Sequence, residues 1–243
     1  MQGRLSMPIN DKIQSFPMNS WKQEFEIASK CGFDIIEWVF DDYLENPLLY
    51  SENLSEIISL SEKYHIQINS VCADYFMEKK LFNESQDMLF DNLKILKKLV
   101  YQSEKLNISI IEIPLVDNSS LKTNDDKLQL IQNIEKIIPT LDDTGVTLVL
   151  ETDLPPMEFR DLLIQFNHPK ILANYDSGNS ASLGYNSKEE LDILKKWIKN
   201  VHVKDRKFQG VTVPFGTGDA DFDLFFSSLS KINYSDDLII QGA

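Results

Sequence analysis

Short runs of continuously apolar residues alternate along the chain with longer stretches in which apolar residues recur at helical spacing. Seven of these runs predict strands, over 35–40, 66–76, 108–116, 146–153, 170–176, 200–205 and 238–241. Because they are apolar throughout rather than alternating, they are typical of parallel strands that are covered on both faces. The stretches between them predict helices over 20–32, 52–64, 83–105, 124–142, 156–167, 187–198 and 221–231.

The order of these elements predicts a barrel. The strands recur about every 25–40 residues, the period of a βα unit. An eighth strand can lie only at the N-terminus, where MQGRLS would be its C-terminal end. We therefore expect an α/β fold, a (β/α)8 TIM barrel forming a single domain over 1–243, without the start of strand one and without the last helix. An open doubly wound sheet is the alternative.

An uncovered last strand would expose apolar surface. This predicts either a homodimer that buries the surface or a chain truncated from a longer protein. With 243 residues, of which 42% are hydrophobic, the chain is long enough to bury one sizeable core.

Composition and charge exclude several classes of partner. The 24 Lys and Arg residues against 38 Asp and Glu give a net charge of −14, which argues against nucleic acid and anionic membrane surfaces. The two cysteines, Cys31 and Cys72, form no CxxC pair, which favours a reducing compartment. Neither a signal peptide nor an apolar run of about 18 residues is present. We expect a cytoplasmic protein with a small-molecule substrate.

Polar residues at the carboxyl ends of barrel strands line the active site of this fold. Seven such residues stand within or directly after the apolar runs: Glu37, Asp74, Glu112, Glu151, Asp176, His202 and Gln241. Burying a carboxylate is costly unless it is paired or binds a cation. Each residue alone fits an ion pair, whereas several converging ones indicate a ligand.

Four of them end successive strands, the fifth to the eighth: Glu151, Asp176, His202 and Gln241. They should therefore lie side by side around one half of the barrel mouth. Oxygen ligands with a single imidazole suit Mn²⁺, Mg²⁺, Co²⁺ or Zn²⁺, and residue types alone do not narrow the choice.

Seven segments in order resemble the xylose isomerase-like TIM-barrel superfamily, in particular its sugar-phosphate isomerase/epimerase branch: GRLS, GFDIIEW, VCADYF, LETD, NYDSGN, VHVKDR and VPFGTGDADF. The resemblance extends from Gly3 to Gln241. It implies a divalent metal held by Glu151, Asp176, His202 and Gln241. It also implies proton abstraction next to the carbonyl of a sugar or sugar phosphate, through an enediolate that the metal stabilises.

Gln241 departs from the family pattern, which has a glutamate at this position. A glutamine can offer its carbonyl oxygen to a metal but cannot accept a proton at neutral pH. The ligand shell then carries two negative charges instead of three, so we expect weaker metal binding. Epimerisation by two glutamates in its usual form is not available to this chain.

Roles for the other residues are hypotheses. We expect Glu151 to act as the base, with Lys204, Asp205 or Glu112 returning the proton. The residues expected to bind substrate are Arg4, Glu37, Asp74, Asn179, Asp205 and Arg206. Gly216 and Gly218 indicate either a phosphate-binding loop or a tight turn in which Asp221 caps the next helix.

Three other functions are alternatives to an isomerase or epimerase. A dehydratase of an inosose-like keto-polyol would share the metal and the base. A non-catalytic sugar-binding barrel would be consistent with Gln241. An apurinic-site endonuclease needs many histidines and binds DNA, and this chain has three histidines and a strongly negative charge.

Overall fold

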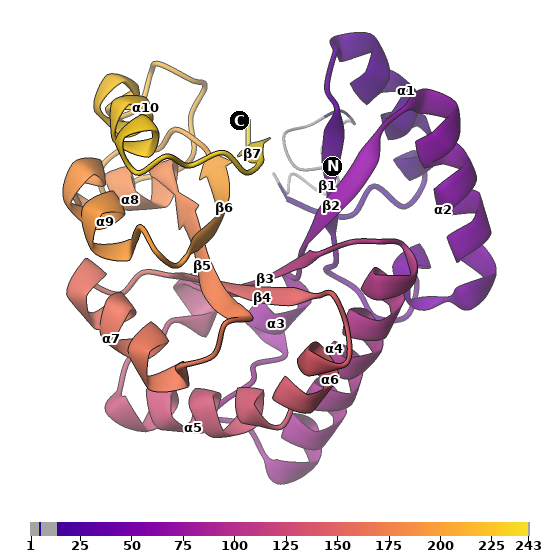
Figure 1. Ribbon diagram of the computed structural model, residues 1–243, viewed down its shortest axis with the longest axis horizontal. Helices are drawn as coiled ribbons and strands as arrows, with labels where there is room; N and C mark the ends of the chain where they lie inside the picture. Colours follow the sequence, from indigo (N-terminus) through magenta and orange to yellow (C-terminus); the bar gives the residue numbers. More distant parts are fainter. Residues whose placement is uncertain (1–4, 6–13, 243) are drawn as a thin grey trace.

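The computed structural model describes Leu5 and residues 14–242, and its centre is a sheet of seven parallel strands in sequence order. The strands are β1 (Ile35–Val39), β2 (Gln67–Cys72), β3 (Ile110–Leu115), β4 (Thr147–Thr152), β5 (Ile171–Asp176), β6 (Ile198–Val203) and β7 (Leu238–Ile240). Figure 1 shows that the sheet curls into a nearly closed barrel with β1 and β7 at its two ends. All seven predicted strands are confirmed, and the strand expected at the N-terminus lies outside the described residues.

Helices cover the outside of this sheet (Figure 1). They are α1 (Trp21–Cys31), α2 (Ser51–Tyr64), α3 (Tyr75–Glu78), α4 (Gln86–Lys105), α5 (Asn124–Glu135), α6 (Ile138–Asp142), α7 (Pro156–Phe166), α8 (Ser177–Leu183), α9 (Ser187–Leu194) and α10 (Phe222–Lys231), with short 3-10 turns η1 (Pro47–Leu49) and η2 (Asp117–Ser119). No helix among the described residues is long and apolar enough to cross a membrane.

Several boundaries differ from the predictions; for example, α9 ends at Leu194 and β6 already begins at Ile198, where a helix was expected over 187–198. The stretch 124–142 was expected to be one helix, but α5 ends at Glu135 and α6 begins at Ile138. Pro139 explains the break, because its ring clashes with the carbonyl of Glu135 and it has no N–H to donate. The run over 66–76 also extends too far, since Tyr75 already starts a helix.

The core lies on both faces of the sheet, as expected for parallel strands. All six residues of β3 are buried, and the central strands β4 to β6 are buried over most of their length. The last strand is different, because Leu238 and Ile240 are 43% and 42% exposed while Ile239 between them is buried. The exposed outer face of β7 agrees with the expected apolar surface, and the homodimer that would cover it stays a prediction.

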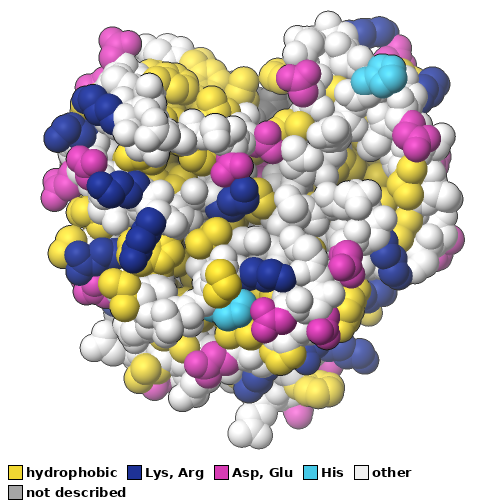
Figure 2. Space-filling model, viewed as in Figure 1, with side chains coloured by type: hydrophobic (Ala, Val, Ile, Leu, Met, Phe, Trp, Pro, Cys, Tyr) yellow, Lys and Arg dark blue, Asp and Glu magenta, His cyan; other side chains and the backbone are white. Residues whose placement is uncertain are grey.

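Surface charge does not gather in one place on the face that Figure 2 shows. Acidic and basic side chains are interspersed there over the helices. The excess of acidic residues is spread out on this face.

Strand register brings the candidate ligands to one level. Asp176 at the end of β5 pairs with His202 of β6, and Val203 pairs with Ile240, so that Gln241 follows directly beside them. Asp176 is also the N-cap of α8, where its Oδ1 accepts a hydrogen bond from the amide of Asn179 at 2.8 Å.

Candidate metal centre and active site

His202 is the centre of a cluster of four buried side chains. Its Nδ1 lies 3.3 Å from Oε2 of Glu151, 3.8 Å from Oδ2 of Asp176 and 2.9 Å from Nε2 of Gln241. The structure therefore brings together the four residues that the sequence proposed as metal ligands, and they converge on one ring nitrogen.

The other ring nitrogen of His202, Nε2, contacts Glu37 on the side away from the cluster. Its Nε2 lies 3.0 Å from Oε1 of Glu37, whose Oε2 accepts hydrogen bonds from Ser70 at 2.6 Å and from Asn200 at 3.3 Å. An Nε2–H that donates to Glu37 leaves the lone pair of Nδ1 directed at the cluster, as metal-binding histidines require. Glu37 was expected to bind substrate, but its side chain is buried behind His202.

Charges in the cluster favour a cation. Burial alone would lower the pKa of His202, but Glu37 and Glu151 raise it well above its usual value. Burial would raise the pKa of Glu151, but its contacts with His202 lower it, so Glu151 is ionised. A bound cation would take the place of the proton on Nδ1.

The donor set fits a divalent metal. Gln241 is buried, and its Oε1 has no hydrogen-bond partner among the described residues. An amide nitrogen and oxygen have nearly the same shape, so turning this amide over would direct Oε1 to the cluster. One imidazole nitrogen, two carboxylates and one amide oxygen are ligands that Mn²⁺, Mg²⁺, Co²⁺ and Zn²⁺ accept.

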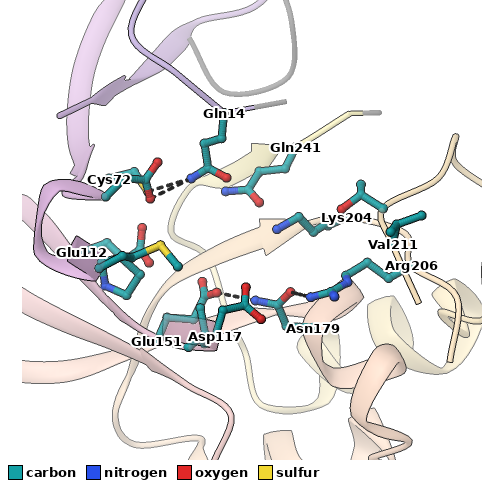
Figure 3. A pocket seen from close by; sticks show the side chains of 15 residues that line it. Gln14, Cys72, Glu112, Asp117, Glu151, Asn179, Lys204, Arg206, Val211 and Gln241 are labelled. Atoms are coloured by element: carbon teal, nitrogen blue, oxygen red, sulfur yellow. Dashed lines mark hydrogen bonds between the residues drawn. The ribbon is translucent and has the colours of Figure 1, made fainter. Parts of the chain in front are cut away.

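Glu151 is also supported from α8 and from the loop after β6. Asn179 donates a hydrogen bond to Oε1 of Glu151, and Nη1 of Arg206 donates to Oδ1 of Asn179 at 2.7 Å (Figure 3). Nε and Nη2 of Arg206 donate to the carbonyl oxygen of Gly210, at 3.2 and 2.9 Å. Asn179 and Arg206 thus orient Glu151 as well as facing the pocket.

A cavity of about 270 Å³ opens directly above this cluster. Seven of the residues predicted for the site line it: Asp74, Glu112, Glu151, Asn179, Lys204, Arg206 and Gln241. Lys204 reaches it with Nζ 3.1 Å from Oδ2 of Asp176, and this carboxylate helps to raise the pKa of Lys204 although burial opposes the shift. This volume is close to the lower end of the range for small-molecule sites.

Two carboxyl groups in this cavity hold protons unusually strongly. Burial raises the pKa of Asp74 to about 7. Burial and the charge of Glu151 raise the pKa of Glu112 well above its usual value. Glu112 also has an oxygen within 4.8 Å of ligand atoms of Glu37 and His202.

Asp205 does not line the cavity, because it holds the following loop together. Its carboxylate accepts hydrogen bonds from the amides of Gly216 at 2.9 Å, Gly218 at 2.8 Å and Ala220 at 3.2 Å. The anion that these loop amides bind is therefore the carboxylate of Asp205, in place of a phosphate. Asp221 accepts from the amide of Leu224 at 2.9 Å and caps α10, which agrees with the tight-turn interpretation. Arg4 lies outside the described residues.

Sequence reasoning missed the buried amides that support the cluster. Asn174 donates to Oε2 of Glu151 at 2.5 Å and lies 3.1 Å from Nδ1 of His202, while Asn200 contacts the other ring nitrogen at 3.3 Å. Each stands two residues before a predicted ligand and so shares its face of the strand. An amide at that spacing in an apolar strand was the signal that could have identified them.

Comparisons with known proteins agree with this geometry. "Putative L-ribulose-5-phosphate 3-epimerase SgbU" of Haemophilus influenzae is 27% identical, with 94% of this chain and 86% of that protein covered. L-ribulose-5-phosphate 3-epimerase UlaE of Escherichia coli is 24% identical, with 91% and 81% covered.

Solved structures share the fold. A D-psicose 3-epimerase crystallised in the presence of D-fructose has a TM-score of 0.77 at 18% identity, with 92% of this chain and 79% of that chain covered. The IolI protein with a bound zinc atom has a TM-score of 0.74 at 18% identity, with 94% and 84% covered. The family profile described as xylose isomerase-like TIM barrel matches residues 25–241, and the chain therefore belongs to this family.

Proposed function

We propose that this chain is a divalent-metal-dependent epimerase of a sugar or sugar phosphate. The observation that carries the proposal is the convergence of Glu151, Asp176 and Gln241 on Nδ1 of His202 at the floor of a cavity. The names of the relatives make L-ribulose 5-phosphate the first substrate to test.

In this proposal Glu151, Asp176, His202 and Gln241 hold the metal. When bound, a divalent cation would polarise the carbonyl and hydroxyl oxygens of the substrate and so acidify the adjacent C–H bond. Glu151, kept ionised by His202 and oriented by Asn179, accepts the proton. Lys204 offers a positive charge to the oxygen that becomes negative. Of the three proton donors inferred from the sequence, Lys204 and Glu112 line the cavity, whereas Asp205 does not.

The test combines metal binding with turnover. Mn²⁺ binding to chelator-treated protein is measured by calorimetry, and the loaded protein is assayed with L-ribulose 5-phosphate, its unphosphorylated ketose and an inosose. We expect metal binding, epimerisation of a ketose, and the loss of epimerisation in Glu151→Gln. Glu158→Gln, an exposed residue of α7, is the matched control.

The other outcomes identify the alternatives. Mn²⁺ binding with loss of water from the inosose would indicate the dehydratase. Mn²⁺ binding without any turnover would indicate a sugar-binding barrel. Absence of metal binding with Glu151 intact would contradict the proposal. The homodimer and the cytoplasmic location stay predictions from the sequence.

A further inference from the structure

An epimerase needs two proton-transfer groups, one for each face of the carbon that it inverts. Glu151 is one such group in the proposed function, on which this inference rests. Gln241 cannot be the other, because a neutral amide neither accepts nor donates a proton at pH 7. The cavity must therefore provide its second acid elsewhere if the chain epimerises its substrate.

Most titratable side chains of the cavity are unsuited to this role. Lys204 is paired with Asp176 at 3.1 Å. Glu112 belongs to β3, next to the strand of Glu151, and only 1% of it is exposed, beside His202 and Glu37. Burial raises the pKa of the Cys72 thiol well above its usual value, so its thiolate is scarce.

Asp74 lies on a different wall of the cavity. It follows β2, and its Oδ1 receives a hydrogen bond from Nε2 of Gln14 at 3.0 Å and one from the Cys72 thiol at 3.3 Å. Figure 3 shows Gln14 and Gln241 at one side of the pocket and Glu151 at the other. Asp74, the hydrogen-bond partner of Gln14, therefore belongs to the same side of the pocket as Gln241, the position that is a glutamate in the family pattern.

The hydrogen bonds, burial and pKa of the Asp74 carboxyl group also suit proton exchange with a substrate. Asp74 lines the cavity, and both of its hydrogen bonds are accepted by Oδ1, so Oδ2 has no hydrogen-bond partner among the described residues. Asp74 is half-buried, and so a substrate can reach it. Burial and the charges of Asp41 and Glu151 raise its pKa, the Cys72 thiol and Lys204 oppose this, and the resulting value of about 7 keeps both protonation states populated at neutral pH.

We propose that Asp74 is the second catalytic acid/base of this site and takes the role that Gln241 cannot fill. In one direction, the substrate C–H bond breaks, its electron pair enters the enediolate, and the proton goes to Glu151. The enediolate carbon then takes the proton of the Asp74 carboxyl on its opposite face, a new C–H bond forms, and Asp74 is left as a carboxylate. Proton exchange with water restores both groups, and the reverse reaction exchanges their roles.

Hydrogen exchange distinguishes the two bases. Mn²⁺-loaded wild type and Asp74→Asn are incubated in D₂O with L-ribulose 5-phosphate, and in parallel with its 3-epimer, and NMR follows both deuterium entry at C3 and formation of the other epimer. We expect Asp74→Asn to lose epimer formation by at least about 100-fold. Deuterium entry into the epimer whose C3–H faces Glu151 should continue within a few fold of wild type, and entry into the other epimer should stop.

Controls separate this inference from a fold defect and from the proposed function. Asp74→Asn should bind Mn²⁺ as wild type does, because Asp74 is not a ligand, and Asp87→Asn on the exposed start of α4 should epimerise as wild type does. Epimerisation at the wild-type rate in Asp74→Asn would overturn the assignment. Equal loss of exchange from both epimers with Mn²⁺ binding intact would also overturn it. A wild type that binds Mn²⁺ but neither exchanges nor epimerises would overturn the proposed function and this assignment together.

Discussion

Glu190 of α9 should make the protein less stable as the pH rises through neutrality. The side chain is 7% exposed, and its Oε2 accepts hydrogen bonds from the hydroxyls of Tyr175, at 3.0 Å, and Ser180. Burial is the main cause that raises its pKa from 4.5 to about 7, although both hydroxyls oppose the shift. The folded protein therefore binds this proton more tightly than the unfolded chain does.

The size of the effect follows from this shift. One pKa unit corresponds to about 1.36 kcal/mol, so ionisation of Glu190 should lower the free energy of unfolding by about 3 kcal/mol in total. The loss is absent below about pH 4.5 and is complete once the pH has risen past about 7. Most of the loss, about 2–3 kcal/mol, should fall between pH 5 and pH 8.

Glu190→Gln tests this reasoning, because glutamine has the shape of the protonated acid and can still accept from both hydroxyls. Urea unfolding at pH 5 and pH 8 gives the free energy of unfolding of both proteins. The difference, variant minus wild type, should increase by about 2–3 kcal/mol between the two pH values. Glu189→Gln, on the same helix but exposed, should show a nearly constant difference. A constant difference for Glu190→Gln would refute the buried-acid argument.

Three further substitutions test the centre and its supports. Gln241→Glu adds a negative charge to the ligand set and should tighten Mn²⁺ binding at least about tenfold by calorimetry, and unchanged affinity would argue against Gln241 as a ligand. Glu37→Gln removes the carboxylate behind His202 and should weaken Mn²⁺ binding about 10–100-fold, whereas an effect on sugar binding alone would favour the substrate role expected from the sequence. Gly218→Ala would place Cβ 1.9 Å from a buried carboxylate oxygen and should lower the free energy of unfolding by about 1–3 kcal/mol. Gly145→Ala is the control, because its Cβ would meet no atom within 4 Å. Equal melting temperatures of the two variants would contradict this contact.

The strands, and the place where the four candidate ligands come together, could be predicted because each leaves a local signal. A parallel strand covered on both faces is apolar throughout, and a polar residue at its end stands out against that run. Asp176 and His202 are recognised in this way, and the register then brings them together. The break at Pro139 was equally visible in the sequence, since proline interrupts a helix wherever it falls inside one.

What a carboxylate contacts could not be predicted, because that depends on chain segments far apart in the sequence. Glu37 and Asp205 have the same local signal as Glu151, a carboxylate within or next to an apolar strand. The structure turns Glu37 towards His202, 165 positions later in the chain, and closes the amides of a distant loop on Asp205. Gln14 lies in a segment that no strand or helix pattern marks, so its contact with Asp74 had no sequence signal.

In the proposed metal centre, the dual contact of Asp176 would make the affinity for a metal depend on the folding of α8. The same carboxylate caps α8 with Oδ1 and faces the cluster with Oδ2, while Asn179 of that helix holds Glu151. Unfolding of the seven residues of α8 would release two supports of the centre at once, the cap contact of Asp176 and the hydrogen bond from Asn179 to Glu151. If the cluster binds a cation as proposed, the apparent dissociation constant is the intrinsic one divided by the fraction of molecules in which α8 is formed, and the cation would in turn protect this helix from opening.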